Sequence, residues 1–271
     1  MKNIFKFLLA GVIIMTSIGA YAQANTKTDI KGTEVTYTAN GVSCKGYIAY
    51  DAAIKGKRPA ILVVPEWWGC NDYTHKRADM LAALGYTAMA VDMYGDGKLA
   101  ANPEEAQKLA TPFYSDPALA KSRLESAEKK LKENVTTDGD KIGAIGYCFG
   151  GSMVLNAAKM GSDYKATVSF HGGLAGIDAA KGAVKGPILV CHGGADKFVS
   201  NEDVKKFRHN LDSVGVVYTF KVYANATHAF SDPDATERGK KFNMPIEYNE
   251  KADKESWTDM QAFLRKTFNQ K

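Results

Sequence analysis

The sequence predicts an α/β fold, with a mostly parallel, doubly wound sheet and an antiparallel hairpin near the N-terminus. Short apolar runs alternate with amphipathic stretches, which is typical of strands that are buried on both faces and joined by right-handed helical crossovers. Upstream of these runs, the segments 34–38 and 42–50 flank Asn40-Gly41, a dipeptide typical of a two-residue hairpin turn.

The expected elements follow one another without a linker or an internal repeat. The apolar runs that predict strands are 60–64, 87–91, 142–145, 166–170, 187–191 and 217–223. The amphipathic stretches that predict helices are 74–84, 103–110, 117–133, 151–160, 201–214 and 254–268. We therefore expect one domain that spans residues 25–271.

The first 22 residues have the pattern of a cleaved secretory signal. Lys2 and Lys6 precede the apolar stretch 7–14, and Ala20-Tyr21-Ala22 places small residues where a signal peptidase reads the chain. A membrane anchor is the less favoured alternative, because the apolar stretch is shorter than the ~20 residues that a spanning helix needs. We expect an exported protein, periplasmic or secreted, without a stable membrane anchor.

The composition excludes several classes of function. Hydrophobic residues make up 45% of the 271 residues and charged residues 24%, which is ordinary for a globular protein. The net charge of +5 comes from interspersed charges of both signs, so nucleic acid is not an expected partner. The sequence has neither a phosphate-binding glycine loop with its lysine nor a metal-ligand pattern, so no cofactor and no metal are expected.

The four cysteines are too few and too scattered for a disulfide framework or a zinc site. Cys191 lies inside an apolar run and is predicted to be a core residue. In an oxidising compartment, a Cys44–Cys70 bridge is an alternative to two separate buried thiols. Cys148 differs from these three because of the residues that surround it.

The strongest sign of chemistry is Gly146-Tyr147-Cys148-Phe149-Gly150-Gly151, between a predicted strand and a predicted helix. It fits the nucleophile elbow, G-x-nucleophile-x-G, with cysteine in place of the commoner serine. Gly146 and Gly150 remove side chains that would collide in so sharp a turn. The start of the following helix favours a thiolate. Cys148 is therefore the candidate nucleophile, and a buried cysteine near a glycine turn is the alternative.

An acid and a histidine follow Cys148 in the chain order of α/β enzymes with such an elbow. Asp196 comes after the run 187–191, and His228 comes after the run 217–223, so both lie at strand carboxyl ends. We predict that His228 takes the thiol proton and that Asp196 orients the imidazole. The other histidines are predicted to be helix-surface residues (His75, His209) or turn residues (His171, His192).

Glu66, Trp67 and Trp68 directly follow the first long apolar run. The loop at this place supplies one oxyanion-hole donor, so the backbone N–H groups of Trp67 and Phe149 are predicted to form the hole. Glu66 is either a turn residue or the acceptor of the thiol proton in the resting enzyme. Four aromatic residues are predicted to line an apolar pocket, with core packing as the alternative: Trp68, Tyr94, Tyr147 and Phe230.

Together these motifs resemble the dienelactone hydrolase family of the α/β-hydrolase superfamily. The resemblance covers nearly all of the chain after residue 22. It rests on the elbow, the Pro-Glu-Trp-Trp-Gly loop and the segments 90–95, 193–196 and 227–230. It implies a Cys-Asp-His triad at Cys148, Asp196 and His228, which cleaves an ester or lactone through an acyl-thioenzyme. It also implies that Glu66 pairs with the resting thiol and swings away when substrate binds.

The sequence departs from the family where the founding enzymes hold the substrate carboxylate with two arginines. It has Asp96 and Asp232 at these places, and aspartates would repel an anionic dienelactone. Lys98 and Arg238 lie nearby as another source of positive charge. We therefore expect a neutral or cationic small-molecule ester or lactone as substrate. Hydrolysis of dienelactone itself and a non-catalytic binding protein on the same fold are the alternatives.

Overall fold

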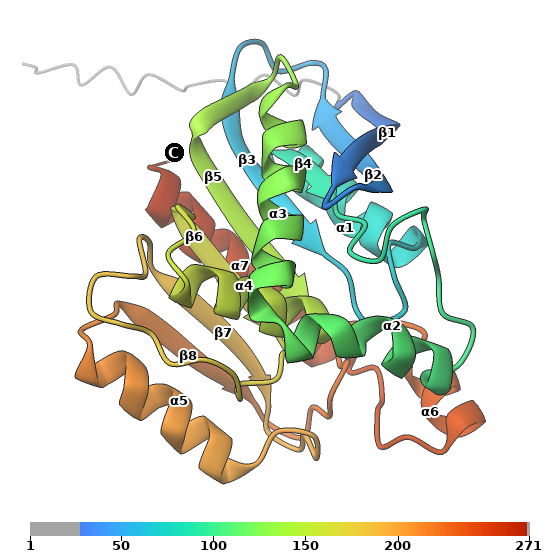
Figure 1. The fold of residues 1–271 in the computed structure, drawn as a ribbon, viewed down its shortest axis with the longest axis vertical. Helices are drawn as coiled ribbons and strands as arrows, with labels where there is room; N and C mark the ends of the chain where they lie inside the picture. Colours follow the sequence, from blue (N-terminus) through green and yellow to red (C-terminus); the bar gives the residue numbers. More distant parts are fainter. Residues whose placement is uncertain (1–27, 270–271) are drawn as a thin grey trace, which may run out of the picture.

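The computed structural model describes residues 28–269, and the predicted signal segment 1–22 lies outside them. Within the described residues, eight strands form one sheet in the order β1-β2-β4-β3-β5-β6-β7-β8 (Figure 1). Strand β2 (Val42–Asp51) pairs antiparallel with its two neighbours, β1 (Ile30–Ala39) and β4 (Thr87–Ala90). The first pair is the hairpin predicted around Asn40-Gly41.

The other strand pairs are parallel, so the predicted mostly parallel sheet is confirmed. These strands are β3 (Arg58–Val64), β5 (Thr137–Tyr147), β6 (Ala166–Phe170), β7 (Ile188–Gly193) and β8 (Tyr218–Tyr223). Runs of branched apolar residues form the middle of β3 and β5, because both of their faces are covered.

Helices cover both faces of the sheet (Figure 1). One face carries α3 (Pro117–Lys132), α4 (Phe149–Lys159) and α5 (Asn201–Ser213), and the other carries α1 (Asp72–Ala83) and α7 (Glu250–Phe268). Neighbouring residues of a strand enter opposite cores: Leu62 faces α3 and α4, whereas Ile61 faces α1 and α7. The sheet is thus doubly wound.

Two elements differ from the prediction. The run 217–223 is predicted to be buried on both faces, but β8 pairs only with β7 at the sheet edge, and Val222 is 59% exposed. The short helix α6 (Ala235–Phe242) is not predicted at all. Its sequence is dominated by charged residues and has Gly239 in its interior, so it has little apolar periodicity to detect.

All four cysteines are free thiols, so the Cys44–Cys70 bridge is not formed. The Cys44 sulfur accepts a hydrogen bond from Arg123 at 2.9 Å, and Cys191 is fully buried in β7 as predicted. In the described part of the chain, no helix is long and apolar enough to cross a membrane.

Candidate active site

The elbow is formed where β5 ends and α4 begins. Cys148 has φ 50° and ψ −113°, a strained conformation for a residue with a side chain. A Cβ atom at Gly146 would lie 2.1 Å from the Gly150 carbonyl oxygen, and one at Gly150 would lie 2.3 Å from the Val64 carbonyl oxygen. Only glycine fits at these two positions. The tight turn holds Cys148 at the N-terminus of α4.

Cys148, His228 and Asp196 form one hydrogen-bonded series, although they come from the ends of three different strands. The Cys148 Sγ lies 3.0 Å from His228 Nε2, and His228 Nδ1 lies 2.8 Å from Asp196 Oδ2. The Asp196 side chain is fully buried, and its other oxygen accepts the Phe198 N–H at 2.8 Å. The acid is therefore fixed on both of its oxygens.

The charges in this series stabilise one another. Burial alone would lower the pKa of His228, but the Cys148 charge and the hydrogen bond with Asp196 raise it well above its usual value. Burial alone would raise the pKa of Asp196, but the hydrogen bond from His228 holds it below its usual value. The positive end of the α4 dipole also favours a thiolate. The site therefore favours a protonated imidazole at His228.

Two backbone N–H groups beside the thiol are available to bind an oxyanion. Phe149 is the first residue of α4, so its N–H has no acceptor within the helix. The N–H of Trp67 has no acceptor among residues 28–269. The Gly150 N–H donates to the Pro65 carbonyl at 3.0 Å, and this bond holds the loop after β3 against the start of α4.

Glu66 lies beside a second carboxyl group, that of Asp232. The two residues are only 3% and 1% exposed, and Asp232 also pairs with Arg238. Burial raises the pKa of Glu66 well above its usual value, and the charges of Asp232 and Cys148 act in the same direction. Because two neighbouring buried carboxylates repel each other, Glu66 is the group that keeps its proton. In this structure, the Cys148 sulfur contacts His228 Nε2.

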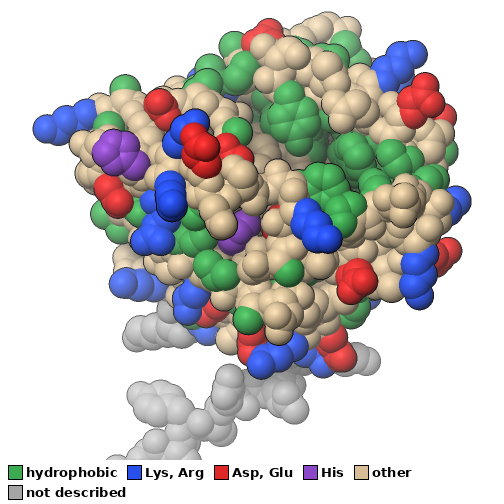
Figure 2. All heavy atoms as spheres, turned by 90° about the horizontal axis from the view of Figure 1, so that it is seen from below, with side chains coloured by type: hydrophobic (Ala, Val, Ile, Leu, Met, Phe, Trp, Pro, Cys, Tyr) green, Lys and Arg blue, Asp and Glu red, His purple; other side chains and the backbone are tan. Residues whose placement is uncertain are grey.

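A cavity of about 350 Å³ opens at Cys148 and His228. Hydrophobic side chains gather on this face of the molecule, viewed toward the carboxyl ends of the strands (Figure 2). Glu66 is the one acidic residue of the lining, and no lysine or arginine of the described chain contributes to it. The apolar part of the lining consists of Trp67, Trp68, Tyr114, Phe198, Val199, Ala229, Met244 and Ile246.

The sequence model of the dienelactone hydrolase family matches residues 44–268. The chain belongs to this family. Protein usf of Aquifex pyrophilus is 33% identical over 210 residues, which cover 73% of this chain and 87% of that protein. A protein of Aquifex aeolicus named "Putative carboxymethylenebutenolidase" is 34% identical over 206 residues, with the same two coverages.

A solved structure of a dienelactone hydrolase-like promiscuous phosphotriesterase from metagenomic libraries is 32% identical, with a TM-score of 0.82. The match covers 88% of this chain and 99% of that one. Family and structure agree on the α/β-hydrolase fold, and the chain is a hydrolase of the dienelactone hydrolase type.

The positions of the family's carboxylate-binding arginines lie outside the cavity lining. Asp96 is exposed and pairs with Lys98 at 3.3 Å, while Asp232 is buried against Arg238. None of these four residues lines the cavity, so the predicted repulsion by the two aspartates has the wrong physical basis. Arg238 is paired with both Asp232 and Asp234.

Of the four aromatic residues predicted to line the pocket, only Trp68 does so. The Tyr94 hydroxyl donates to the Trp67 carbonyl at 2.9 Å and thus holds the loop that follows β3. Tyr147 stacks on Phe170 in the core that α1 and α7 cover, because the alternation of β5 turns it away from Cys148. Phe230 is fully buried in the same core.

Some cavity residues come from α2 (Pro103–Ser115) and from the segment after α6, and these were not predicted from the sequence. Tyr114, Met244 and Ile246 carry no motif, and their only sign was an apolar side chain. They meet Cys148 through contacts that are distant in the sequence, which a local pattern does not encode.

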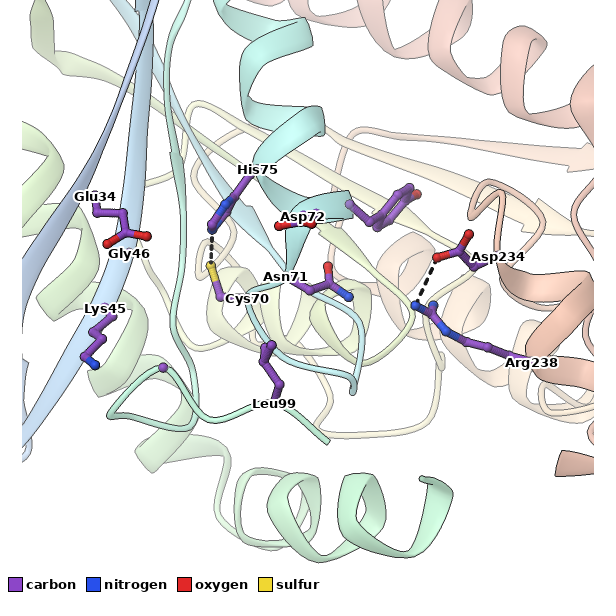
Figure 3. A pocket seen from close by; sticks show the side chains of 12 residues that line it. Glu34, Lys45, Gly46, Cys70, Asn71, Asp72, His75, Leu99, Asp234 and Arg238 are labelled. Carbon is purple, nitrogen blue, oxygen red and sulfur yellow. Dashed lines mark hydrogen bonds and ion pairs between the residues drawn. The ribbon is translucent and has the colours of Figure 1, made fainter. Parts of the chain in front are cut away.

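A second Cys–His pair borders another cavity, of about 430 Å³, shown in Figure 3. The Cys70 Sγ lies 3.6 Å from His75 Nε2. Burial raises the pKa of the Cys70 thiol and lowers that of His75, so both side chains are neutral near pH 7. Unlike His228, His75 forms no hydrogen bond with a carboxylate among residues 28–269.

Proposed function

We propose that this protein hydrolyses a neutral carboxylic ester or lactone through nucleophilic attack by Cys148. The proposal rests on one observation. The hydrogen-bonded series of Cys148, His228 and Asp196 opens onto an apolar cavity to which the described chain contributes no lysine or arginine.

The reaction proceeds in two halves. In the first half, the Cys148 thiolate attacks the carbonyl carbon while its proton is held on His228 Nε2. The oxyanion accepts hydrogen bonds from the N–H groups of Trp67 and Phe149. Breaking the carbon–oxygen bond then transfers the proton from His228 to the leaving oxygen and leaves the acyl group on sulfur. In the second half, His228 deprotonates a water molecule, which hydrolyses the thioester and restores the thiol.

The proposed neutrality of the substrate follows from the cost of burying charge. A substrate carboxylate that enters this cavity loses water and meets no lysine or arginine among the described residues, and both nitrogens of His228 are already engaged by Asp196 and Cys148. Arg238 would have to leave both Asp232 and Asp234 to reach it. An uncharged acyl or alcohol group instead gains contact with the apolar wall.

The substrate proposal is tested with matched esters of one leaving group. One ester carries a free carboxylate at the end of its acyl chain, and its partner carries the methyl ester of that carboxylate. We expect kcat/KM to be at least about tenfold higher for the neutral partner. A preference for dienelactone or for the carboxylate partner would contradict the proposed substrate class.

The nucleophile is tested with Cys148→Ala and His228→Ala. We expect each to lower kcat by about 10³-fold or more, as is usual for triad residues. Cys70→Ala is the matched control, because it removes a thiol that also contacts a histidine. Intact-mass measurement during turnover of a slow ester should show the acyl group on wild type and not on Cys148→Ala. Equal hydrolysis rates for Cys148→Ala and wild type would exclude the acyl-thioenzyme at Cys148, whereas no hydrolysis of any ester by wild type would leave the binding-protein alternative.

A further inference from the structure

His171 follows β6 directly, and the proposed reaction gives it no role. Its side chain is fully buried, although it carries two polar ring nitrogens. Its φ of 39° lies in the left-handed region, which is uncommon for residues other than glycine. A strained and buried histidine is retained at a functional site when its contacts compensate for the strain.

The hydrogen bonds of His171 fix its tautomer. The backbone N–H of Cys148 is shared between two acceptors, the Phe170 carbonyl oxygen at 3.0 Å and His171 Nδ1 at 3.1 Å. Because a backbone N–H only donates, Nδ1 must be the unprotonated acceptor, and the ring proton is therefore on Nε2. That Nε2–H donates to the Ser231 hydroxyl oxygen at 2.8 Å. His171 thus binds the nucleophile turn with one nitrogen and the segment after His228 with the other.

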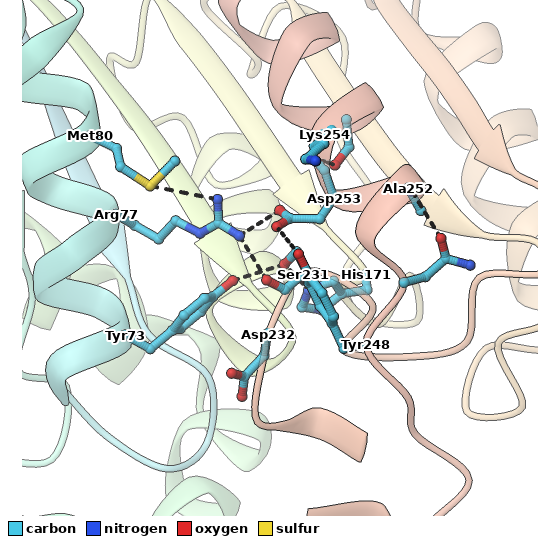
Figure 4. Close-up of polar contacts among 12 residues, drawn as sticks. Tyr73, Arg77, Met80, His171, Ser231, Asp232, Tyr248, Ala252, Asp253 and Lys254 are labelled. Carbon is cyan, nitrogen blue, oxygen red and sulfur yellow. Dashed lines mark hydrogen bonds and ion pairs between the residues drawn. The ribbon is translucent and has the colours of Figure 1, made fainter. Parts of the chain in front are cut away.

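The Ser231 end of this link is itself fixed (Figure 4). The Ser231 hydroxyl also shares a hydrogen bond with the Tyr73 hydroxyl, at 2.9 Å. The Ser231 carbonyl accepts a hydrogen bond from Arg77 at 2.7 Å, and Arg77 forms an ion pair with Asp253 at 2.6 Å. Side chains from α1 and α7 therefore hold the same serine that His171 contacts.

These bonds close a ring around the reacting atoms. Cys148 contacts His228 through its sulfur and His171 through its backbone N–H. Ser231 lies three residues after His228 and contacts the other side of His171. The separation between the nucleophile turn and the histidine loop is therefore set twice, once by the reacting pair and once by the imidazole of His171.

We propose that His171 is a positioning residue, which holds the nucleophile turn and the histidine loop at the distance that the Cys148–His228 pair requires. This inference rests on the proposed function of that pair. Burial lowers the pKa of His171 well below its usual value, and the positive charges of His228 and Arg77 act in the same direction. Tyr73, Tyr147 and Asp253 complete the titratable surroundings. His171 therefore stays neutral and Nδ1 stays an acceptor over the working pH range.

The test separates the two links of His171. His171→Leu removes both links, whereas His171→Asn places an amide oxygen near the position of Nδ1 and suits the positive φ. Ser231→Ala removes only the second link and leaves the bond from Arg77 to the Ser231 carbonyl intact. His192→Leu is the control, because His192 is also a buried histidine and lies near the end of β7, the neighbouring strand.

We expect His171→Leu to lower kcat by about 10²-fold with little change in KM, because a small misplacement of reacting groups has this effect. His171→Asn and Ser231→Ala should each give a smaller loss. Their combination should add little to either one, since both break the same link. His192→Leu should retain the wild-type kcat.

The second readout is the pH dependence of Cys148 alkylation by iodoacetamide, which needs no substrate. Loosening the ion pair should move its midpoint upward by about one pH unit in His171→Leu. A role in stability alone would lower Tm and leave this midpoint unchanged. Wild-type kcat and an unchanged midpoint in folded His171→Leu, or in Ser231→Ala if the former does not fold, would overturn the inference. Failure of the proposed function would be distinct, since Cys148→Ala would then remain active.

Discussion

At the scale of single residues, Glu66 and Asp232 stand out as two buried carboxyl groups in contact. Two negative charges this close in a buried site are strongly unfavourable, so one group retains its proton. Asp232 has the cation of Arg238 beside it and is the better site for the charge. Glu66 is then a neutral wall of the cavity, which agrees with a neutral substrate.

We expect Glu66→Gln to keep activity comparable to wild type, because a neutral amide can still donate to Asp232. Loss of a general base typically lowers the rate by about 10²-fold or more, and such a loss would contradict this assignment. The measurement is kcat and KM on the neutral ester.

The same substitution should change the pH dependence of stability. The unfolded chain releases the Glu66 proton above its usual pKa of 4.5, whereas the folded protein keeps it. The free energy of unfolding therefore falls as pH rises from the usual pKa of Glu66 toward its raised pKa in the folded protein. Glu66→Gln lacks this decline, so its Tm advantage over wild type should grow from about pH 5 to about pH 8. Glu104→Gln, which removes an exposed carboxyl group from α2, is the control.

At the scale of secondary-structure elements, the elbow depends on the contact between the start of α4 and the end of β3. Gly150→Ala would place a methyl group against the Val64 and Pro65 carbonyls. We expect a loss of about 1–3 kcal/mol in the free energy of unfolding, together with lower kcat, because the oxyanion loop must move. Gly139→Ala in β5 is the control, since its nearest contact would be 3.8 Å away. Equal stability of the two variants in urea unfolding would contradict this view of the elbow.

Elements with strong periodicity were predictable from the sequence, and those defined by their neighbours were not. The runs in β3 and β5 are apolar because both faces are covered, and this is visible in the sequence alone. The edge position of β8 depends on the absence of a further strand beside it, which its own residues do not specify. The helix α6 is stabilised by burial of Ala235 near Ile246, a contact that no local pattern contains.

Likewise, the sequence indicated those residues of the candidate site that lie in a short motif directly after a predicted strand. Cys148, Asp196 and His228 each follow a strand, and the structure brings them together. The direction of Tyr147, the pairing of Asp232 with Arg238 and the contact of His171 with Ser231 depend on residues far away in the chain. Such contacts are decided by packing, and packing is a property of the assembled core.

At the scale of the whole molecule, we propose that the chain is exported and that cleavage follows Ala22. The expected mature protein begins at Gln23 and is found outside the cytoplasm. Intact mass and N-terminal sequencing of the protein from that fraction would check this. Replacing Ala20 and Ala22 by bulky residues should block processing, and an unprocessed, cytoplasmic wild-type chain would rule the proposal out.

The nucleophile and its base are 80 residues apart in the chain. During synthesis, a chain that ends before β8 therefore has the elbow cysteine without a base, and its thiol reacts as an ordinary one. Reactivity is acquired only when the last strand docks and brings His228 with it. The rate at which Cys148 is alkylated can therefore be used to follow folding. In refolding experiments, the return of fast alkylation at Cys148 should mark completion of the sheet.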